Sequence, residues 1–356
     1  VRRFNHRRGG FKPAPTIYPL DRGGMRAAKD PQALAAAVRA GDRRALARAI
    51  TLVESDKAEH AAAAEALLAA LLPHSGRAFR IGISGAPGVG KSTFIEAFGL
   101  HLIANGHRVA VLAIDPSSPR SGGSILGDKT RMEELGKSAS AFIRPSPTGG
   151  TLGGVARRTR EAGLICEAAG FDIVLIETVG VGQSETAVAG MVDAFLLLIA
   201  PAGGDELQGL KKGIVELADM VVVNKEDGEL AAAAGRAAAE YRAALHLLRP
   251  NTPGWEPPVL TASSLERRRL DKIWAEFTRY RDCLGPKGLA AKRSDQAKAW
   301  MWSEIEAALR TNLLADAAVS RQVHALETKV SQGLITPAAA ARQVLASLGK
   351  AGPASS

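Results

Sequence analysis

The sequence contains little cysteine. Among its 356 residues only Cys166 and Cys283 are cysteines, and they lie too far apart to form a CxxC pair. This scarcity is typical of a protein from a reducing compartment, and it argues against a cysteine-based metal site. Long apolar runs are also missing, since none approaches the roughly 20 residues that a membrane-spanning helix needs. We therefore expect a soluble protein with no membrane partner.

Acidic residues are outnumbered by basic ones, and the formal net charge is +10 at pH 7. About half of this excess lies in residues 1–24, which have no apolar segment of the kind found in secretory signals. This leader is Arg-rich and acid-poor, as transit peptides are, but its proline and glycine oppose an amphipathic helix, and Met25 is a second candidate start. The other basic residues are scattered without interleaved aromatic residues, so nucleic acid is not the favoured partner.

Two kinds of segment follow one another along the chain. Alanine- and leucine-rich stretches with helical periodicity flank a middle region of short apolar runs. The runs are "FRIGIS", "RVAVLAI", "SAFIRP", "FDIVLIE", "AFLLLIA", "DMVVVN" and "PVLTA". Near-continuous apolar strands separated by helices indicate a sheet covered on both faces. We therefore predict an α/β fold with a mainly parallel central sheet.

The predicted domain organisation follows this pattern. Its segments are a disordered basic leader (1–29), an N-terminal helical extension (30–75), the α/β domain (76–285), a C-terminal helical extension (286–350) and a tail (351–356). In the first extension, Gly41 and Asp42 are expected to separate two helices and Pro73 to end the second. In the other, Trp300, Trp302, Ile305 and Leu309 are expected to share one helical face. That face either packs on the main domain or forms a dimer interface.

One motif points to a nucleotide. The stretch "FRIGISGAPGVGKSTF" contains a full match to the phosphate-binding loop GxxxxGK[ST], between a predicted strand and a predicted helix. The loop comprises Gly85, Ala86, Pro87, Gly88, Val89, Gly90, Lys91 and Ser92, followed by Thr93. Glycines let consecutive N–H groups turn inward toward phosphates at the helix N-terminus. We expect Lys91 to reach the β- and γ-phosphates and the Ser92 hydroxyl to bind Mg²⁺.

A second motif reads the base. Asn224, Lys225 and Asp227 form an NKxD sequence at the end of another predicted strand. The Asp227 carboxylate can accept hydrogen bonds from the N1–H and 2-amino groups of guanine, whereas adenine offers an acceptor and a C–H there. Because a site built for paired hydrogen bonds rejects the wrong partner, this motif predicts GTP rather than ATP. Asn224 is expected to brace the phosphate loop, and the backbone N–H groups of Ala262, Ser263 and Ser264 to approach the guanine O6.

Acidic residues at strand ends are the candidates for the catalytic and metal side of the site. Glu177 ends "FDIVLIE", where an acid wastes a core position unless it meets a cation or water; the alternative is an ordinary solvated glutamate. Asp115 ends another apolar run, and Asp128 lies in a long Gly/Ser-rich loop. Gly180 is placed to bring its N–H to the γ-phosphate. We predict catalytic roles for Lys91, Glu177, Asp128 and Gly180.

With these residues in place, the chain resembles the MeaB/ArgK/MMAA family of G proteins over roughly residues 30 to 350. The resemblance rests on "GAPGVGKST", "AIDPSS", "GDKTRM", "IETVGVGQSE", "PAGGDELQGLKKGI" and "VVVNKED", in that order. It implies a homodimeric, Mg²⁺-dependent P-loop GTPase that acts as a chaperone for an adenosylcobalamin-dependent acyl-CoA mutase, gating cofactor loading and protecting the mutase from inactivation.

The resemblance also assigns residues. It implies that Ser92, Asp115, Asp128 and Glu177 surround the metal. It further implies that residues 200–211 form a switch toward the partner, with Gln208 and Lys211 as its coupling residues. The periodicity alone indicates a loop and a helix start in that stretch. The implied location is the cytoplasm, with the mitochondrial matrix as the alternative.

The sequence fits three other functions less well. A metal-insertion GTPase needs a Cys/His cluster, which seven scattered histidines and two cysteines do not provide. A targeting GTPase of the signal-recognition type needs a Met-rich region, and the chain has five methionines. A kinase needs an acceptor pocket with a base, and no stretch indicates one. Methylmalonyl-CoA mutase is the first candidate client, and isobutyryl-, 2-hydroxyisobutyryl- and ethylmalonyl-CoA mutases are the alternatives.

Overall fold

The structure is a computed structural model that describes residues 30–114, 132–145, 152–178, 184–201, 212–248 and 250–348. Within these ranges, no helix combines the length and the apolar character that crossing a bilayer requires. Several residues singled out from the sequence fall outside these ranges: Asp115, Asp128, Gly180, Gln208 and Lys211.

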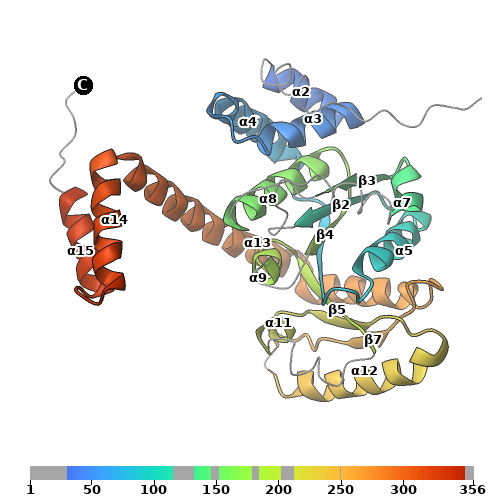
Figure 1. The fold of residues 1–356 in the computed structure, drawn as a ribbon. Helices are drawn as coiled ribbons and strands as arrows, with labels where there is room; N and C mark the ends of the chain where they lie inside the picture. The colour runs from blue at the N-terminus through green and yellow to red at the C-terminus, as the bar shows by residue number, and fades with distance from the viewer. Residues whose placement is uncertain are drawn as a thin grey trace, which may run out of the picture. The chain divides into compact units, whose positions relative to one another are not determined.

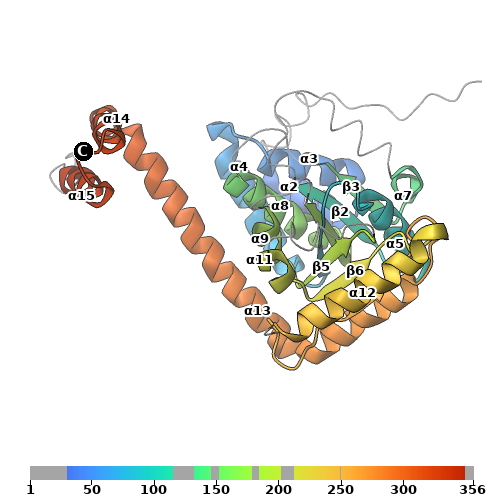
Figure 2. The same ribbon diagram turned by 60° about the horizontal axis from the view of Figure 1, so that its bottom comes forward.

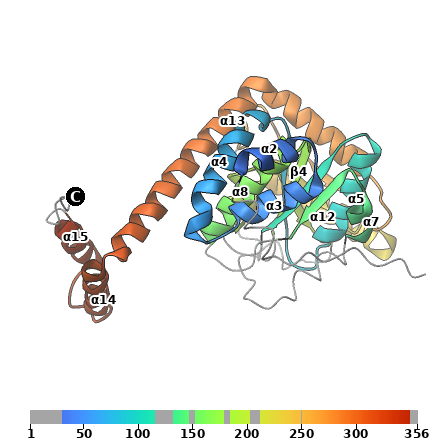
Figure 3. The ribbon, with the colours of Figure 1, turned by 90° about the horizontal axis from the view of Figure 1, so that it is seen from above.

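Three helices precede the sheet: α2 (Pro31–Arg39), α3 (Arg43–Val53) and α4 (Ala58–Leu71), followed by the 3-10 turn η1 (Leu72–His74). The predicted break is present, since Gly41 has φ 80° and Asp42 caps α3 by accepting from the Arg44 and Ala45 amides. These two hydrogen bonds also hold the pKa of Asp42 below its usual value. Figure 3 shows the three helices against α8 (Leu152–Ala168).

Two ion pairs join this helical extension to the sheet domain. Asp56 pairs with Arg158 of α8, and Glu54 pairs with Arg144. Arg144 is the last residue of a strand and has an additional hydrogen-bond partner in Thr51, at 3.4 Å. Because Arg158 and the Glu54 carboxylate are largely shielded from water, these pairs hold the extension in a defined place rather than decorating its surface.

All seven runs predicted as strands are strands. They are β1 (Phe79–Ser84), β2 (Val109–Ile114), β3 (Ala141–Arg144), β4 (Ile173–Thr178), β5 (Ala194–Ile199), β6 (Met220–Val223) and β7 (Val259–Thr261). They pair in the order β3-β2-β4-β1-β5-β6-β7, and every pairing is parallel. The strands are buried almost throughout, as expected of a parallel sheet covered on both faces, and the predicted fold class is confirmed.

Helices cover both faces of this sheet (Figure 1). Besides α8, the helices from α5 to α13 are α5 (Lys91–Ala104), α7 (Glu133–Lys137), α9 (Ser184–Ala189), α11 (Lys212–Glu216), η2 (Gly228–Leu230), α12 (Ala231–His246) and α13 (Leu270–Ala315). Ile81 of β1 shares a core with Phe94 of α5 and Phe277 of α13. Its neighbour Gly82 faces the opposite side, where a Cβ would lie 2.7 Å from a Val188 methyl of α9. Helix α12 contacts β6 and β7, and Figure 2 shows it beside β6.

A buried polar group anchors the first part of α13. The Tyr280 hydroxyl donates to Asp219 Oδ1 at 3.0 Å and lies 3.1 Å from the Thr252 hydroxyl. Burial raises the pKa of Tyr280, and the nearby Asp219 carboxylate adds to this effect. The other carboxylate oxygen of Asp219 accepts from the Phe195 amide at the start of β5. The start of α13 is therefore tied to the amino ends of β5 and β6.

The chain divides into two compact units, residues 1–289 and 290–356. Helix α13 crosses this boundary and is interrupted shortly before it, at Gly285 (φ 61°, ψ 174°), which is followed by Pro286. In the second unit, α14 (Ala317–Ser331) and α15 (Pro337–Leu348) pack through Val319, Leu326, Ala340 and Val344.

The predicted apolar face on α13 needs one correction. Trp302, Ile305 and Leu309 are exposed, whereas Trp300 is half-buried. Two residues turn a helix by about 200°, so Trp300 lies on the other side of α13 from Trp302. The exposed face contains Met301, Trp302, Ile305 and Leu309.

Candidate nucleotide site

The phosphate loop lies where β1 ends and α5 begins. Gly90 is in the left-handed region (φ 93°), and a Cβ there would lie 2.8 Å from Asn224 Nδ2. At Gly85 a Cβ would lie 2.2 Å from the Leu198 carbonyl oxygen of β5. Both positions therefore require glycine for steric reasons. The predicted context of a strand, a glycine-rich loop and a helix N-terminus is present.

Lys91 is the first residue of α5 and is buried. Its Nζ donates to the carbonyl oxygens of Gly85 at 2.7 Å and Ala86 at 3.2 Å, so the side chain curls back over the loop. Burial lowers the pKa of Lys91, while the carboxylates of Glu177 and Glu185 act in the opposite direction. A cation at a helix N-terminus, inside a turn of backbone N–H groups, is an arrangement that suits an anion.

Ser92 and Glu177 converge beside this lysine. The Ser92 hydroxyl donates to Glu177 Oε1 at 3.4 Å. Glu177 is buried near the end of β4, where it pairs in register with Ile83 of β1 and Ala113 of β2. The next residue, Thr178, donates its hydroxyl to Ser84 at 2.9 Å. The structure therefore makes Glu177 a buried acid at the phosphate loop and not a solvated one.

Hard oxygen donors of this kind suit Mg²⁺. The described ranges contain no group of three or more His, Cys, Asp or Glu side chains able to hold a metal ion. Asp115 directly follows the last residue of β2, but it lies outside the described residues, as do Asp128 and Gly180.

The base end is assembled from two neighbouring strands. Asn224 is buried after β6 and donates from Nδ2 to the Val89 carbonyl at 3.0 Å. Its Oδ1 accepts from the Ser264 amide at 3.1 Å and from the Ser264 hydroxyl at 2.6 Å. Asn224 thus connects the phosphate loop to the segment after β7, and its contact with the loop is the brace that the motif predicts.

Lys225 and Asp227 flank this brace. Lys225 has φ 59°, and its Nζ donates to the Gly88 carbonyl at 2.7 Å. Asp227 Oδ2 accepts from the Ser263 hydroxyl at 2.7 Å. The structure therefore brings every described residue of the two sequence motifs to one edge of the sheet, the edge formed by the carboxyl ends of the strands.

The segment after β7 differs in part from the expectation. The Ala262 amide donates to the Val223 carbonyl at 2.9 Å, and the Ser264 amide donates to Asn224. These two N–H groups are engaged within the protein, because they hold the segment against β6. The Ser263 hydroxyl instead orients Asp227, a role that the motif alone did not indicate.

Sequence reasoning missed two features of the site. Glu185, buried in the first turn of α9, is close enough to raise the pKa of Lys91. In the sequence, the feature that could have indicated it is the second glutamate of "IETVGVGQSE". Two arginines of "SSLERRRL" contact Glu226 of the NKxD segment. Arg268 donates to the Glu226 carbonyl at 2.6 Å, and Arg269 pairs with the Glu226 carboxylate at 3.1 Å. Their signal was a run of basic residues directly after a base-binding segment.

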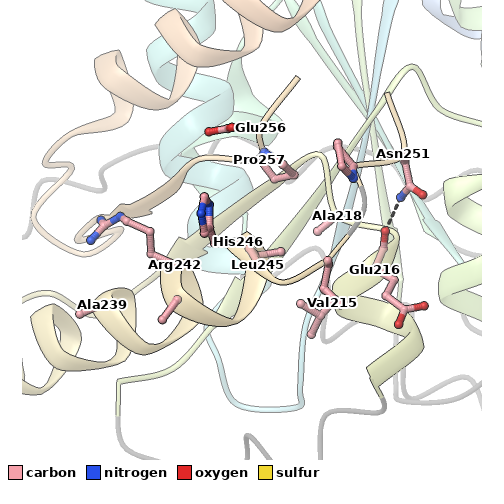
Figure 4. Close-up of a pocket in the computed structure, with 13 residues that line it drawn as sticks. Val215, Glu216, Ala218, Ala239, Arg242, Leu245, His246, Asn251, Glu256 and Pro257 are labelled. Atoms are coloured by element: carbon pink, nitrogen blue, oxygen red, sulfur yellow. Dashed lines mark hydrogen bonds between the residues drawn. The ribbon is translucent and has the colours of Figure 1, made fainter. Parts of the chain in front are cut away.

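A cavity of about 770 Å³ lies elsewhere, between α11, the last turns of α12 and the segment before β7. Arg242, His246, Glu216 and Glu256 contribute polar groups, and Leu245 is part of its apolar wall (Figure 4). These elements meet at the amino ends of β6 and β7, whereas the phosphate loop follows the carboxyl end of β1. The cavity is therefore not part of the nucleotide site.

Known proteins are similar to this chain in sequence and in fold. The family model described as "Methylmalonyl Co-A mutase-associated GTPase MeaB" matches residues 46–318. A relative from Caulobacter vibrioides is 60% identical over 311 residues, covering 87% of this chain and 95% of the relative. The Mus musculus protein described as "Methylmalonic aciduria type A homolog, mitochondrial" is 49% identical over 316 residues, covering 86% and 76%. The crystal structure of a LAO/AO transport system kinase superposes with a TM-score of 0.74 at 38% identity, covering 90% of this chain and 97% of that one.

Proposed function

The chain belongs to the MeaB family of methylmalonyl-CoA mutase-associated GTPases, and we propose that its nucleotide site couples GTP hydrolysis to the cofactor loading and protection of an adenosylcobalamin-dependent mutase. As a member of this family it is a GTPase, converting GTP to GDP and phosphate. We further propose which residues bind the nucleotide, which metal ion assists, which mutase is the client, and that the protein is a homodimer.

The nucleotide is proposed to lie along the edge formed by the carboxyl ends of the strands. The backbone amides of residues 85–93 and the Lys91 ammonium take the phosphates, and Asp227 takes the N1–H and 2-amino groups of guanine. The observation that carries this assignment is the Asn224 brace, because one buried side chain hydrogen-bonds both to Val89 of the loop and to Ser264 of the base segment. A ligand with phosphate at one end and a purine at the other fits a site whose two ends are held in a fixed relation.

Mg²⁺ is proposed to bind beside the phosphates, held by Ser92 with Glu177, Asp115 and Asp128, directly or through water. When bound, it supplies positive charge to the phosphate oxygens. The residues of this chain do the rest. Lys91 stabilises charge on the transferring phosphoryl group, and Glu177 orients the attacking water or a metal-bound water. Gly180 is assigned to the γ-phosphate through its N–H.

The proposed client is methylmalonyl-CoA mutase, with isobutyryl-, 2-hydroxyisobutyryl- and ethylmalonyl-CoA mutases as alternatives. The family description and the mouse relative support the first of these. The GTPase is proposed to gate cofactor loading and to protect the mutase from inactivation. Residues 200–211 form the proposed switch toward the mutase, with Gln208 and Lys211 as coupling residues. The compartment is proposed to be the cytoplasm, with the mitochondrial matrix as the alternative, which the mouse relative described as mitochondrial supports.

A homodimer is the proposed assembly. The segments predicted as N-terminal extension (30–75), GTPase domain (76–285) and C-terminal dimerisation extension (286–350) are kept in this proposal. Met301, Trp302, Ile305 and Leu309 support it, because they give α13 an exposed apolar face that a second copy would cover. Isolated apolar residues on a surface need no explanation, but four within nine residues of one helix do.

Three measurements test this function. Titration calorimetry with GDP and ADP tests the base assignment, and equal affinities would overturn it. Phosphate release from GTP, with and without each candidate mutase, tests the partner. We expect slow intrinsic hydrolysis, on the order of the unassisted rates of G proteins, and acceleration by the cognate mutase. Transfer of labelled phosphate from GTP to an acceptor other than water would instead favour the kinase alternative.

A further inference from the structure

The segment between β7 and α13 is a tight loop that ends in three arginines. Ser263 and Arg268 form an antiparallel bridge in which the Arg268 amide donates to the Ser263 carbonyl at 2.9 Å. The Ser263 hydroxyl also accepts from the Glu266 amide at 3.0 Å while donating to Asp227. Arg267 (φ 54°) and Arg269 (φ 63°) adopt the left-handed conformation that non-glycine residues rarely occupy. Such strain persists only where surrounding contacts hold it in place.

Two of the three arginines contact the NKxD segment. Arg268 donates from Nη2 to the backbone carbonyl of Glu226, the residue directly before Asp227. Arg269 uses its two terminal nitrogens on different partners. One lies 3.1 Å from Glu226 Oε1, and the other donates to the Thr261 hydroxyl at the end of β7. The two arginines therefore hold both the main chain and the side chain of Glu226 against β7.

Glu226 depends on this contact. Its side chain is only 12% exposed, and its Oε2 is buried without a hydrogen bond to any residue that the structure describes. A shielded carboxylate is costly unless a cation lies beside it, and Arg269 supplies that cation. On its other side, the Glu226 amide donates to the Ala262 carbonyl at 3.0 Å. The main chain that presents Asp227 is thus fixed from the amide, the carbonyl and the carboxylate of one neighbouring residue.

We propose that Arg269, assisted by Arg268, is a positioning residue for guanine recognition: it holds Glu226 so that the Asp227 carboxylate is preorganised for two hydrogen bonds to the base. The proposal rests on the proposed contact between Asp227 and guanine. Arg269 itself does not touch the nucleotide. Its effect is on the geometry of a two-point contact, and such contacts weaken steeply with misalignment. Loss of Arg269 should therefore lower affinity for guanine more than affinity for a base that makes one of the two hydrogen bonds.

Inosine diphosphate provides that comparison, because hypoxanthine keeps N1–H and lacks the 2-amino group. We expect Arg269→Ala to raise the Kd for GDP about tenfold and the Kd for inosine diphosphate about threefold, a loss of part of one charge-assisted network. The Kd for inosine diphosphate divided by the Kd for GDP should therefore fall. In hydrolysis assays the KM for GTP should rise while kcat changes by less than about twofold, because the phosphate side is untouched.

The chain offers a matched control in Arg267. This arginine has the same left-handed backbone and a similar exposure, but it pairs with Glu134 of α7 and not with the NKxD segment. Arg267→Ala should therefore leave both dissociation constants near those of the unmodified protein. Arg269→Lys should lie between the two, because one ammonium cannot serve Glu226 and Thr261 in the forked geometry of a guanidinium. Glu226→Gln, which keeps an acceptor and removes the charge, should shift the same ratio if Arg269→Ala does not fold.

The outcomes distinguish the role of Arg269 from the underlying contact between Asp227 and guanine. A smaller preference for GDP over inosine diphosphate in Arg269→Ala and Glu226→Gln, but not in Arg267→Ala, supports the proposal. An unchanged preference in both variants overturns it, as does an equal loss of affinity for the two nucleotides, which would indicate general loosening. Asp227→Asn tests the underlying base contact: if it fails to improve binding of xanthosine diphosphate, the assignment of Asp227 is wrong. If it succeeds while the Arg269 variants show no effect, only the role of Arg269 is wrong.

Discussion

The two ends of the nucleotide site are built in different ways. The phosphate end is one continuous stretch, Gly85 to Thr93, in which Lys91 donates back to the Gly85 carbonyl and a Cβ at Gly85 or Gly90 would collide with the Leu198 carbonyl or the Asn224 side chain. The base end is assembled from separate segments after β6 and β7, joined by side chains of Asn224, Ser263 and Ser264. The first kind of site is local, and it is therefore fully visible in a sequence. The second depends on contacts between segments about 40 residues apart, of which a motif shows only one side.

Lys91→Ala should produce the largest effect, and it tests the phosphate end alone. We expect hydrolysis to fall by about 10²- to 10³-fold or more, since a fixed charge aimed at the transferring phosphoryl group is removed. Phosphate release at saturating GTP measures this change, with circular dichroism to confirm the fold. Glu177→Gln should slow the reaction less and alter its Mg²⁺ dependence. Full turnover of Lys91→Ala would remove the loop from the mechanism.

Asp227→Asn should give the next largest effect, and it tests the base end alone. Affinity for GTP should fall about 10- to 100-fold because asparagine keeps one acceptor oxygen and places its own NH2 donor against the second donor of guanine, while affinity for xanthosine triphosphate, whose 2-oxo group accepts from that NH2, should rise. Calorimetry with the two nucleotides measures the exchange. Since the phosphate end is unchanged, hydrolysis of xanthosine triphosphate at saturation should approach the rate that the unmodified protein reaches with GTP.

Asn224→Ala should be smaller in each assay but should affect both ends. Three hydrogen bonds are removed, and the Val89 carbonyl and the Ser264 amide lose their partner. We expect GDP affinity to fall about tenfold, together with a lower melting temperature, because buried polar groups are left unsatisfied. Binding of inorganic pyrophosphate, which lacks a base, should also weaken. If only base affinity changed, the two ends would be independent and the brace would have no role.

The proposed switch should influence the reaction through the partner. Gln208→Ala and Lys211→Ala are expected to reduce the mutase-stimulated rate several-fold, and by more than they reduce the basal rate, because the proposal assigns these residues to coupling with the mutase and not to nucleotide binding. Parallel assays with and without the cognate mutase measure the difference. An identical stimulation in variants and unmodified protein would place the coupling elsewhere.

The smallest effect on catalysis is expected in the C-terminal extension. Trp302→Glu should shift the protein from dimer to monomer, because it places a charge on the exposed apolar face of α13, while GTP hydrolysis stays within about twofold. Sedimentation velocity measures the assembly state. Thr311→Ala is a suitable control, since Thr311 is nine residues from Trp302 and therefore about 180° around the helix. A dimer that survives Trp302→Glu would exclude this face as its interface.

Prediction from sequence succeeded where a pattern is local. The seven strands are short, near-continuous apolar runs, the break before α3 has its glycine and its capping aspartate, and the phosphate loop is a complete motif. It was wrong about Trp300, because four residues were grouped by hydrophobicity without regard to the 100° step of a helix. It also missed Arg269 and Glu185, whose roles depend on neighbours distant in the chain.

The sequence by itself determined the fold class, the family and the position of the phosphate-loop motif between a strand and a helix, because apolar periodicity and a glycine-rich loop act through residues that are adjacent in the chain. Only the tertiary structure decided that Glu177 is buried beside Ser92 and that Asn224 contacts both ends of the site. It also decided that Arg269 pairs with Glu226, the residue directly before Asp227. These relations arise because parallel strands place their carboxyl ends at one edge of the sheet. Segments separated by helices meet there, and no sequence spacing encodes which side chains then touch.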